Sequence, residues 1–357
     1  MGVRASCSLP YALSFDGRSR RGFLRAAAGG LLAPLLGAQR KAEVSSFDLS
    51  LLDGPLTPND LFFIRDHFPP PETNPQKWTL AVGGAVAKGF SLSYEELLAL
   101  PRQTVAATLE CAENPVGGGL VSHAEWTGVA LAELLRRAEP GAEGKFVRLA
   151  GPGGYARTIP LEKALHAATL LAHRMNGERL PREHGFPVRA VVPGWYAMDS
   201  VKWLERIEVL AGPDGGRWMT ERYVRRVRSL LAGSRTEGEV RAVLVKSVFS
   251  RPAEGAILQG RRFVVRGAAW AGESAVAQVE VSADGGGTWG PARRTTAVQP
   301  FSWMHWEYLW TIPGPGEYEL VARAGDDQGR QQPLERAAER LDDYEQNACQ
   351  RVRVRVA

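Results

Sequence analysis

One stretch decides the fold class of the second half of the chain: Ala277-Gln278-Val279-Glu280-Val281-Ser282-Ala283-Asp284-Gly285-Gly286-Gly287. Ala277, Val279 and Val281 alternate with polar residues, and this period of two is typical of a β-strand that buries one face. The strand pattern stops at Asp284-Gly285-Gly286-Gly287, where an aspartate followed by glycines predicts a hairpin turn.

The same kind of pattern continues toward the C-terminus. Trp306, Tyr308 and Trp310 occupy alternate positions, and Pro313-Gly314-Pro315-Gly316 separates them from a further strand pattern. The chain ends in Arg351-Val352-Arg353-Val354-Arg355-Val356, which gives a strand one apolar and one basic face. Several short strands separated by turn signals predict an immunoglobulin-like β-sandwich.

Upstream of this region, short apolar runs alternate with helical stretches. Strands are predicted over residues 78–82, 146–150 and 188–192. Helices are predicted over residues 94–100, where Ser93 and Glu96 have the spacing of a capping box, and over residues 130–138. We therefore predict a mixed α+β domain over residues 39–238, followed by the sandwich over residues 239–357.

The first 38 residues have the pattern of an export signal. Ser19-Arg20-Arg21-Gly22-Phe23-Leu24-Arg25 is a twin-arginine motif, and an apolar run and the small residues Gly37-Ala38 follow it. This order predicts a twin-arginine signal peptide over residues 1–38 and a periplasmic location. The alternative is an Ala- and Leu-rich amphipathic helix with a basic start. Because the twin-arginine route carries folded proteins, the motif indicates a cofactor that is inserted before export.

The charge distribution excludes one class of partner. The chain has a formal net charge of +5, but five arginines and a single acidic residue fall in the first 38 residues. The remainder is nearly neutral and has no basic stripe, so we expect no nucleic-acid partner. The chain also contains no run of eighteen apolar residues that would span a bilayer.

Three cysteines are too few for a disulfide scaffold, and Cys7 lies in the predicted signal. Cys111 and Cys349 either pair with each other or serve separately, one as a ligand thiolate and the other as a small buried hydrophobe. Cys111 follows a predicted strand in Leu109-Glu110-Cys111-Ala112-Glu113-Asn114, and the glycines 117–119 come next. A thiolate on such a loop is a ligand that soft metals prefer, although a lone cysteine is also a common core residue.

Two further segments bring cations together. His184-Gly185-Phe186-Pro187-Val188-Arg189 places a histidine and an arginine around a glycine, and Val201-Lys202-Trp203 places a lysine beside an aromatic residue. Arginine and lysine are the side chains that hold phosphate groups. The alternative is a hydrogen-bonded core histidine with two solvated cations.

A resemblance decides between these interpretations. The chain resembles sulfite oxidases from about residue 55 to the C-terminus. Five segments carry the resemblance and occur in the family's order: Phe62-Phe63-Ile64-Arg65-Asp66-His67, the cysteine segment at 109–114, Leu180-Pro181-Arg182-Glu183-His184-Gly185-Phe186-Pro187-Val188-Arg189, Val201-Lys202-Trp203-Leu204 and Asp284-Gly285-Gly286-Gly287-Thr288-Trp289.

The resemblance implies a catalytic domain that holds molybdenum on molybdopterin, a pyranopterin dithiolene, followed by an immunoglobulin-like dimerisation domain. Cys111 matches the cysteine that ligates the metal. Tyr223, five residues after Trp218, matches a tyrosine beside the reactive oxygen, and a core tyrosine is the alternative.

The remaining predicted site residues match positions that contact the cofactor. Phe63, Ile64, Arg65, Asp66 and His67 match the segment along the pterin, and Arg65 also reaches the substrate pocket. His184, Arg189, Ser200, Val201 and Lys202 match the positions that hold the ring and the phosphate.

The resemblance also implies the reaction: oxygen-atom transfer to a small sulfur-type substrate, whose two electrons leave one at a time. The sequence has no Cys-x-x-Cys-His haem site, so the resemblance implies an external carrier, either a c-type cytochrome or a membrane partner, and a homodimer. Two alternatives are an S- or N-oxide reductase with the same cofactor and a non-catalytic exported scaffold with the same fold. The dimerisation domain counts against the reductase, and the retained site residues count against the scaffold.

The substrate pocket departs from the family pattern. Residues 113–119 contain no arginine, and Val116 stands where the family has one. The segment Leu341-Asp342-Asp343-Tyr344-Glu345-Gln346-Asn347 also lacks an expected arginine, and Gly151-Pro152-Gly153-Gly154 lacks an aspartate. We therefore expect Arg65 to be the one matched anion contact, with Asp342 opposing it. Asp342 and Glu113 in place of cations should weaken anion binding, so sulfite should be a poor substrate. A neutral or less charged sulfur compound, or a sulfur atom carried by a partner protein, is the expected better substrate.

Overall fold

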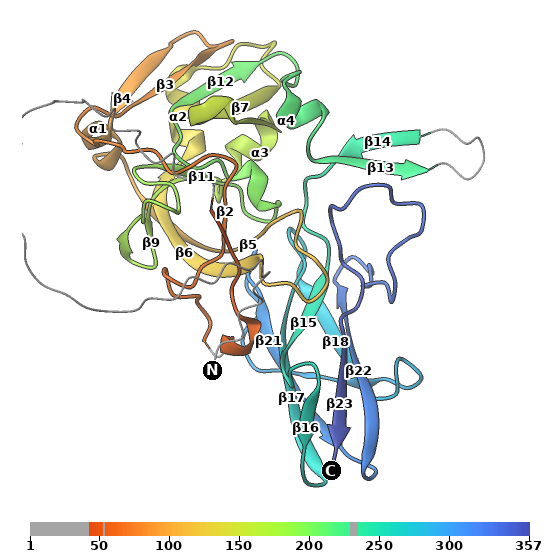
Figure 1. The fold of residues 1–357 in the computed structure, drawn as a ribbon. Helices are drawn as coiled ribbons and strands as arrows, with labels where there is room; N and C mark the ends of the chain where they lie inside the picture. Colours follow the sequence, from red (N-terminus) through yellow and green to blue (C-terminus); the bar gives the residue numbers. More distant parts are fainter. Residues whose placement is uncertain (1–42, 53, 229–234) are drawn as a thin grey trace, which may run out of the picture. The chain divides into compact units, whose positions relative to one another are not determined.

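The computed structural model describes residues 43–52, 54–228 and 235–357 (Figure 1). The predicted signal peptide, with Cys7 and the twin-arginine motif, lies outside the described residues. So does part of the segment in which the predicted domain boundary falls.

The first part of the chain contains two five-stranded sheets. One five-stranded sheet is built from β5 (Gln103–Glu110), β6 (Val121–Ala130), β9 (Leu170–Met175), β10 (Glu178–Arg179) and β11 (Arg189–Val191). The other has the order β4-β3-β12-β7-β8, with β3 (Thr79–Gly84), β4 (Phe90–Ser93), β7 (Phe146–Ala150), β8 (Ala156–Pro160) and β12 (Arg206–Leu210). In Figure 1, β3, β4, β7 and β12 lie together at the top.

Short helices connect and cover these strands. They are α1 (Tyr94–Leu98), α2 (Leu131–Ala138), α3 (Leu161–Leu165), α4 (Arg217–Thr220) and the 3₁₀ turns η1 (Leu49–Leu51), η2 (Pro152–Gly154) and η3 (Ala197–Asp199). Ser93 and Glu96 form the predicted capping box at the start of α1. Leu131, Leu134 and Leu135 of α2 are buried in the same hydrophobic cluster as Leu80 of β3, as the apolar face of this helix predicts.

Two short antiparallel pairs flank the sheets. β1 (Val44–Ser45) pairs with β2 (Ile64–Arg65), and β13 (Val224–Arg228) pairs with β14 (Arg235–Glu239). Glu239, the last residue of β14, is the residue at which the sequence predicted the sandwich domain to begin. The described residues from 43 to 357 belong to one compact unit.

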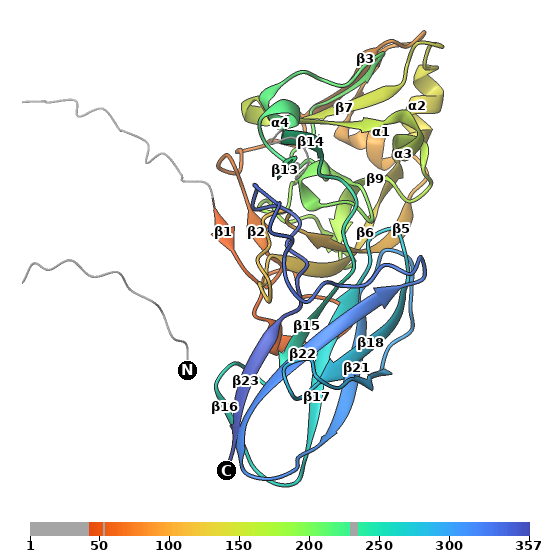
Figure 2. The same ribbon diagram turned by 90° about the vertical axis from the view of Figure 1, so that its right-hand side faces the viewer.

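The C-terminal part is a sandwich of two sheets. One contains β15 (Lys246–Arg251), β17 (Arg262–Trp270), β20 (Arg293–Arg294) and β21 (Met304–Thr311). The other contains β16 (Ala256–Leu258), β18 (Val276–Ser282), β19 (Gly290–Pro291), β22 (Gly316–Asp326) and β23 (Arg351–Val356). Figure 2 shows β22 and β23 side by side, with the C-terminus at the end of β23.

The inward faces of both sheets form one core. Val265 and Trp306 from the first sheet lie in the same buried cluster as Val279, Leu320 and Val352 from the second. In β23 the valines are buried and the arginines exposed, as the alternation predicts.

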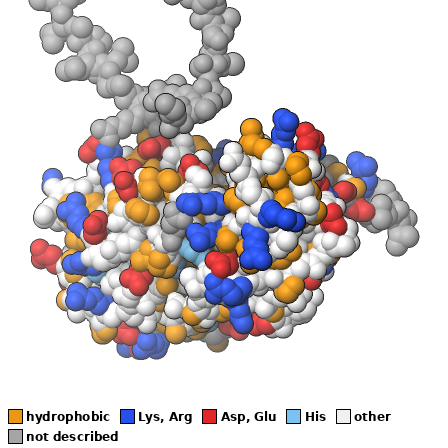
Figure 3. Space-filling model, turned by 90° about the horizontal axis from the view of Figure 1, so that it is seen from below, with side chains coloured by type: hydrophobic (Ala, Val, Ile, Leu, Met, Phe, Trp, Pro, Cys, Tyr) orange, Lys and Arg blue, Asp and Glu red, His pale blue; other side chains and the backbone are white. Residues whose placement is uncertain are grey.

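On the face drawn in Figure 3, acidic and basic side chains are interspersed.

One strand departs from the predicted alternation. Val279 and Val281 of β18 are buried, but Ala277 is exposed and Val276 is buried instead. The register between β18 and β22 shifts between Val276 and Gln278. Such a bulge inserts one residue into the strand and reverses the facing of the residues before it.

None of the helices in the described residues is long and apolar enough to cross a membrane.

Candidate active site

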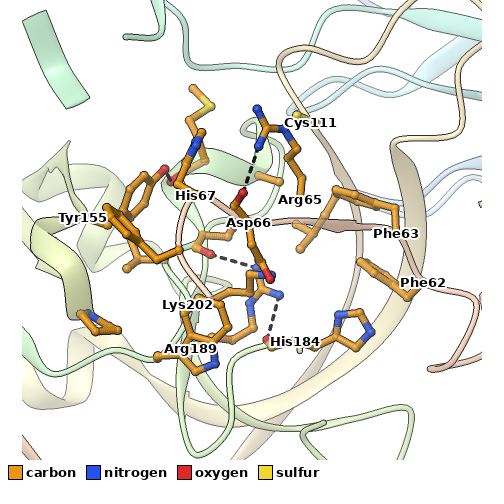
Figure 4. Close-up of a pocket in the computed structure, with 18 of the residues that line it drawn as sticks. Phe62, Phe63, Arg65, Asp66, His67, Cys111, Tyr155, His184, Arg189 and Lys202 are labelled. Atoms are coloured by element: carbon orange, nitrogen blue, oxygen red, sulfur yellow. Dashed lines mark hydrogen bonds and ion pairs between the residues drawn. The ribbon is translucent and has the colours of Figure 1, made fainter. Parts of the chain in front are cut away.

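A pocket lies in the first domain and gathers residues from several elements (Figure 4). Its walls are formed by Phe62, Phe63, Arg65, Asp66, His67, Phe68, Leu109, Cys111, Pro152, Tyr155, His184, Arg189, Ala197, Met198, Ser200, Val201, Lys202, Trp203 and Tyr223. In Figure 4, Cys111 and Arg65 lie toward one end, whereas Arg189 and His184 lie toward the other.

Cys111 is the first residue after β5, on a loop that hydrogen bonds hold in place. Its backbone N–H donates to the Leu120 carbonyl at 2.9 Å, and the N–H of Asn114 donates to the Cys111 carbonyl at 2.9 Å. The loop also passes close to Phe47: a Cβ at Gly119 would lie 1.9 Å from the Phe47 carbonyl oxygen, so only glycine fits there.

The Cys111 thiol is buried and free. Burial raises the pKa of the Cys111 thiol to about 11, even though the backbone N–H of Glu113 hydrogen-bonds to the sulfur. A thiolate at this position therefore requires a strong positive partner, and a soft metal ion is such a partner. Cys349 is also buried and free, so the two cysteines that we considered as a disulfide pair are not joined.

Arg189 and Lys202 form the cationic part of the pocket. The Arg189 guanidinium donates only to backbone carbonyls in the described residues: to His184 at 3.1 Å, to Ser200 at 2.9 Å and to Ala190 at 3.3 Å. Burial lowers the pKa of Arg189 to about 9. A buried guanidinium that is not paired with a carboxylate offers the N–H donors that bind a phosphate group.

Lys202 is the second cation of this part. Its ammonium donates to the Glu183 carbonyl at 2.8 Å and forms an ion pair with the buried Asp66. Burial lowers the pKa of Lys202 to about 8, and the charge of Asp66 opposes that shift. Two cations face one carboxylate, so this part of the pocket carries a net positive charge. Gly185, at φ +112°, allows the approach, because a Cβ there would lie 2.9 Å from the Arg189 Cβ.

His184 lies beside these cations but contributes no charge. Its Nε2–H donates to the Asn59 carbonyl at 2.9 Å, and its ring meets the ring of Phe62 edge-on. Burial lowers the pKa of His184 to about 3. The imidazole is therefore neutral and serves as a polar wall residue at neutral pH.

Tyr223 and His67 meet at the Cys111 end of the pocket. The His67 Nε2 lies 2.5 Å from the Tyr223 hydroxyl, and the His67 ring also packs on Trp218. Burial lowers the pKa of His67 to about 4 and raises the pKa of Tyr223 well above its usual value. Both groups are neutral at pH 7, and their hydrogen bond fixes the direction of the hydroxyl.

A buried ion pair between Arg157 and Asp199 lies against the ring of Tyr223. Arg157 places its guanidinium 5.4 Å from the centre of the Tyr223 ring, and its Nε donates to Asp199 at 2.8 Å. Tyr223 itself has a positive φ of 56°, a conformation that is costly for a non-glycine residue. Such local strain persists only where the surroundings impose it, and the packing around this tyrosine does so.

Arg65 is paired with a carboxylate. Its Nε and Nη2 donate to one oxygen of Glu113 at 3.1 and 2.8 Å. The other Glu113 oxygen accepts from Arg222 at 2.9 Å. Arg65 lines the pocket beside Cys111, so this triad lies at the end of the pocket where a substrate would meet the metal.

The expectation that Asp342 opposes Arg65 is wrong. Asp342 accepts hydrogen bonds from Arg340 at 2.7 Å and from the backbone N–H of Tyr344 at 3.0 Å. These partners satisfy its charge within the C-terminal segment, and it does not line the pocket. The carboxylate that meets Arg65 is Glu113, which the sequence places only two residues after Cys111.

The structure brings most of the predicted site residues to this one pocket. Ile64 is the exception: it lies in β2, where it pairs with Ser45 of β1, and does not line the cavity. The lining residues Tyr155, Met198 and Trp203 were not predicted. Trp203 stands beside Lys202 in the segment Val201-Lys202-Trp203, so its position in the site could have been predicted from the sequence. Tyr155 and Met198 stand in no recognisable motif.

Comparison with known proteins identifies the family. Residues 67–218 match the oxidoreductase molybdopterin binding domain, and residues 239–357 match the Mo-co oxidoreductase dimerisation domain. The sulfite oxidase of Gallus gallus is 36% identical over 312 residues, which cover 78% of this chain and 68% of that enzyme. This chain belongs to the sulfite oxidase family.

Two further proteins are similar to this chain. The mitochondrial sulfite oxidase of Homo sapiens is 34% identical, over 79% of this chain and 58% of that protein, so the chain spans little more than half of its length. The crystal structure of the sulfane dehydrogenase SoxCD from Paracoccus pantotrophus superposes with a TM-score of 0.79 at 28% identity. The superposition covers 89% of this chain and 86% of that chain. The predicted fold class, a mixed α+β molybdopterin-binding domain followed by a β-sandwich, is confirmed.

Family membership makes this chain a molybdenum-dependent oxidoreductase whose cofactor is molybdopterin. The residues of the pocket fit that cofactor. Cys111 supplies a free buried thiol at one end, and Arg189 and Lys202 supply buried cations for a phosphate at the other. Phe62 and Phe63 line the apolar wall of the same cavity.

Proposed function

We propose that this chain oxidises a sulfur compound by oxygen-atom transfer and passes the two electrons, one at a time, to an external cytochrome. The observation that carries the proposal is the position of the free, buried Cys111 thiol in the same cavity as the Tyr223 hydroxyl and the buried cations. The names of the relatives, sulfite oxidase and sulfane dehydrogenase, support a substrate that contains sulfur. When bound, the molybdenum cofactor supplies the oxygen atom and accepts the electron pair.

In this proposal Cys111 holds the metal, and the Phe63-to-His67 segment lies along the pterin. Ile64 contributes through its backbone, since it does not line the cavity. Arg189 and Lys202 hold the phosphate. Arg189 donates to backbone carbonyls and Lys202 pairs with Asp66, and each retains N–H donors that can bind an anion. His184, Ser200 and Val201 complete this wall.

Tyr223 orients the reacting atoms. Its hydroxyl keeps its proton at neutral pH, because burial raises the pKa of Tyr223. In this proposal His67 donates its Nε2–H to the Tyr223 oxygen, which leaves the Tyr223 hydroxyl proton free to point toward the reacting oxygen. An oriented donor near the metal ligand stabilises negative charge on an oxygen atom during transfer, and removing one such donor costs about a hundredfold in rate.

We also propose where and with which partners the reaction takes place. The twin-arginine motif supports export to the periplasm with the cofactor already inserted. The dimerisation domain over residues 239–357 supports a homodimer. The electron acceptor is a c-type cytochrome or a membrane partner, and the substrate is a small molecule that enters the pocket.

An assay with a one-electron acceptor tests the proposal. Purified protein loaded with cofactor is mixed with sulfite or with a thioether, and ferricyanide reduction is followed. We expect two ferricyanide ions to be reduced for each sulfur atom oxidised. Cys111→Ser should abolish turnover, whereas Cys349→Ser, which alters a buried free cysteine that does not line the pocket, should retain it. Failure of the fully loaded protein to oxidise any sulfur compound would overturn the proposal.

A further inference from the structure

The end of the pocket beside Cys111 contains an unusual arrangement of charge. Glu113 accepts hydrogen bonds from both Arg65 and Arg222, and it uses one carboxylate oxygen for each guanidinium. Its side chain is 23% exposed and that of Arg65 is 24% exposed, so the pair is screened from water only in part. The geometry is that of a charge-assisted clamp, because Arg65 donates through two nitrogens to the same oxygen.

The clamp limits what Arg65 can bind. Its Nη1 donates to the Asp66 carbonyl at 3.0 Å, while its Nε and Nη2 donate to Glu113. Three of the five N–H donors of the guanidinium are thereby engaged, one on each nitrogen. A small dianion that approaches Arg65 must either displace the carboxylate or lie beside it, and both arrangements place like charges close together.

The other charged groups of the pocket do not offset this effect. Arg157 is neutralised by Asp199. Arg189 and Lys202, which share the carboxylate of Asp66, lie in the part of the cavity that the proposed function assigns to the phosphate. His67 is neutral, because burial lowers its pKa to about 4. Arg65 and Arg222 together exceed Glu113 by a single positive charge.

We propose that Glu113 is a specificity-determining residue, which engages Arg65 and Arg222 and thereby disfavours small dianions such as sulfite relative to uncharged sulfur compounds of the thioether class. The inference rests on the proposed function and names its substrate class. Of the two acidic residues expected to weaken anion binding, Asp342 and Glu113, only Glu113 contacts the pocket arginine directly.

The two reactions to be compared have the same balance. Sulfite and water give sulfate, two protons and two electrons. A thioether and water give a sulfoxide, two protons and two electrons. In each case one sulfur–oxygen bond forms, the sulfur is oxidised, and two ferricyanide ions each take one electron. The substrates therefore differ in charge at the pocket and not in electron demand.

The test uses the cofactor-loaded enzyme and the variant Glu113→Gln, which keeps the size of the side chain and removes its charge. The measured quantity is the ratio of kcat/KM for sulfite to kcat/KM for methyl phenyl sulfide. We expect this ratio to rise at least about tenfold, the effect of roughly one recovered charge-assisted hydrogen bond to the anion. The gain should appear in KM for sulfite, and the inhibition constant for sulfate should fall with it.

Glu208→Gln is the matched control. Glu208 also pairs with an arginine, Arg148, at 2.7 Å, and its side chain is 25% exposed, but Arg148 does not line the pocket, whereas Arg65, the partner of Glu113, does. Its ratio should stay at the wild-type value. Molybdenum content measured in every variant shows that the cofactor is present.

The outcomes separate the inference from the function on which it rests. If wild-type enzyme oxidises sulfur compounds but the ratio and the sulfate inhibition constant are unchanged in Glu113→Gln, Glu113 does not set specificity and the inference is overturned. If the loaded wild-type enzyme oxidises neither substrate, the proposed function itself fails. A wild-type preference for sulfite over methyl phenyl sulfide that Glu113→Gln leaves unaltered would likewise contradict the role of Glu113.

Discussion

Lys246, the first residue of β15 in the sandwich, places its ammonium 2.5 Å from the carboxylate of Glu110, the residue that precedes Cys111. Both side chains are almost fully buried. Glu110 also accepts hydrogen bonds from Trp270 at 2.8 Å and from Asn114 at 3.0 Å. The C-terminal domain therefore anchors the base of the loop that carries the proposed metal ligand.

This anchor predicts a large stability effect. Lys246→Met leaves the Glu110 carboxylate buried without its cation, and breaking one partner of a buried pair costs about 3–5 kcal/mol. We expect the urea midpoint of unfolding to fall accordingly. The double variant Glu110→Gln with Lys246→Met removes both charges and should recover part of the loss. A single variant that unfolds at the wild-type urea concentration would show that the pair does not hold the two parts together.

The phosphate end of the pocket predicts a pH dependence of anion binding. Burial lowers the pKa of Lys202 to about 8 and that of Arg189 to about 9, so their charges are present below these values and are lost as the pH rises through them. Cofactor-free protein should therefore bind sulfate, whose charge is constant in this range, more weakly at pH 9.5 than at pH 7. Isothermal titration calorimetry measures this change.

A pair of lysine variants shows whether Lys202 causes that change. Lys202→Met should weaken sulfate binding at pH 7 and reduce its pH dependence. Lys88→Met, which alters an exposed lysine paired with Glu139, should leave both unchanged. Equal pH dependence in wild-type protein and Lys202→Met would assign the effect to another group.

Export is tested at the twin-arginine motif. Replacing Arg20 and Arg21 by lysine should leave folded, cofactor-loaded protein in the cytoplasm, because this route depends on the arginine pair. Cell fractionation followed by molybdenum analysis of each fraction measures the result. Periplasmic yield of the variant equal to that of the wild type would remove this argument for a periplasmic location.

Assembly is tested in solution. The dimerisation domain predicts a two-fold symmetric homodimer, because equivalent surfaces meet in such an interface. Small-angle scattering at micromolar concentration should give twice the mass of the mature chain. A monomer mass at every concentration would contradict the dimer.

The sequence predicted the parts of the fold that depend on local pattern. β23 alternates as its valines and arginines indicate, and α2 buries the leucines that its periodicity places on one face. The facing of Ala277 was predicted wrongly, because a bulge depends on the register of the partner strand β22 and not on the sequence of β18 alone. Local periodicity carries no information about that register.

The candidate site was predictable where it lies in short segments. The residues around Cys111, His184 and Lys202 stand in recognisable motifs, and the structure brings them to one cavity. The sequence indicated that Glu113 weakens anion binding, but it did not predict the pairing of Glu113 with Arg65, which is 48 residues away, or that of Glu110 with Lys246, which is 136 residues away. Such contacts follow from the arrangement of whole sheets and leave no trace in local spacing.

The most direct test of the central claim is X-ray absorption at the molybdenum edge, made on the purified wild-type protein and on Cys111→Ser. We predict about one molybdenum per chain in both proteins, with one sulfur neighbour fewer in the variant, since a first ligand is lost while many contacts still hold the pterin. Wild-type protein without molybdenum, or a variant whose spectrum equals that of the wild type, would contradict the assignment of Cys111 as the metal ligand.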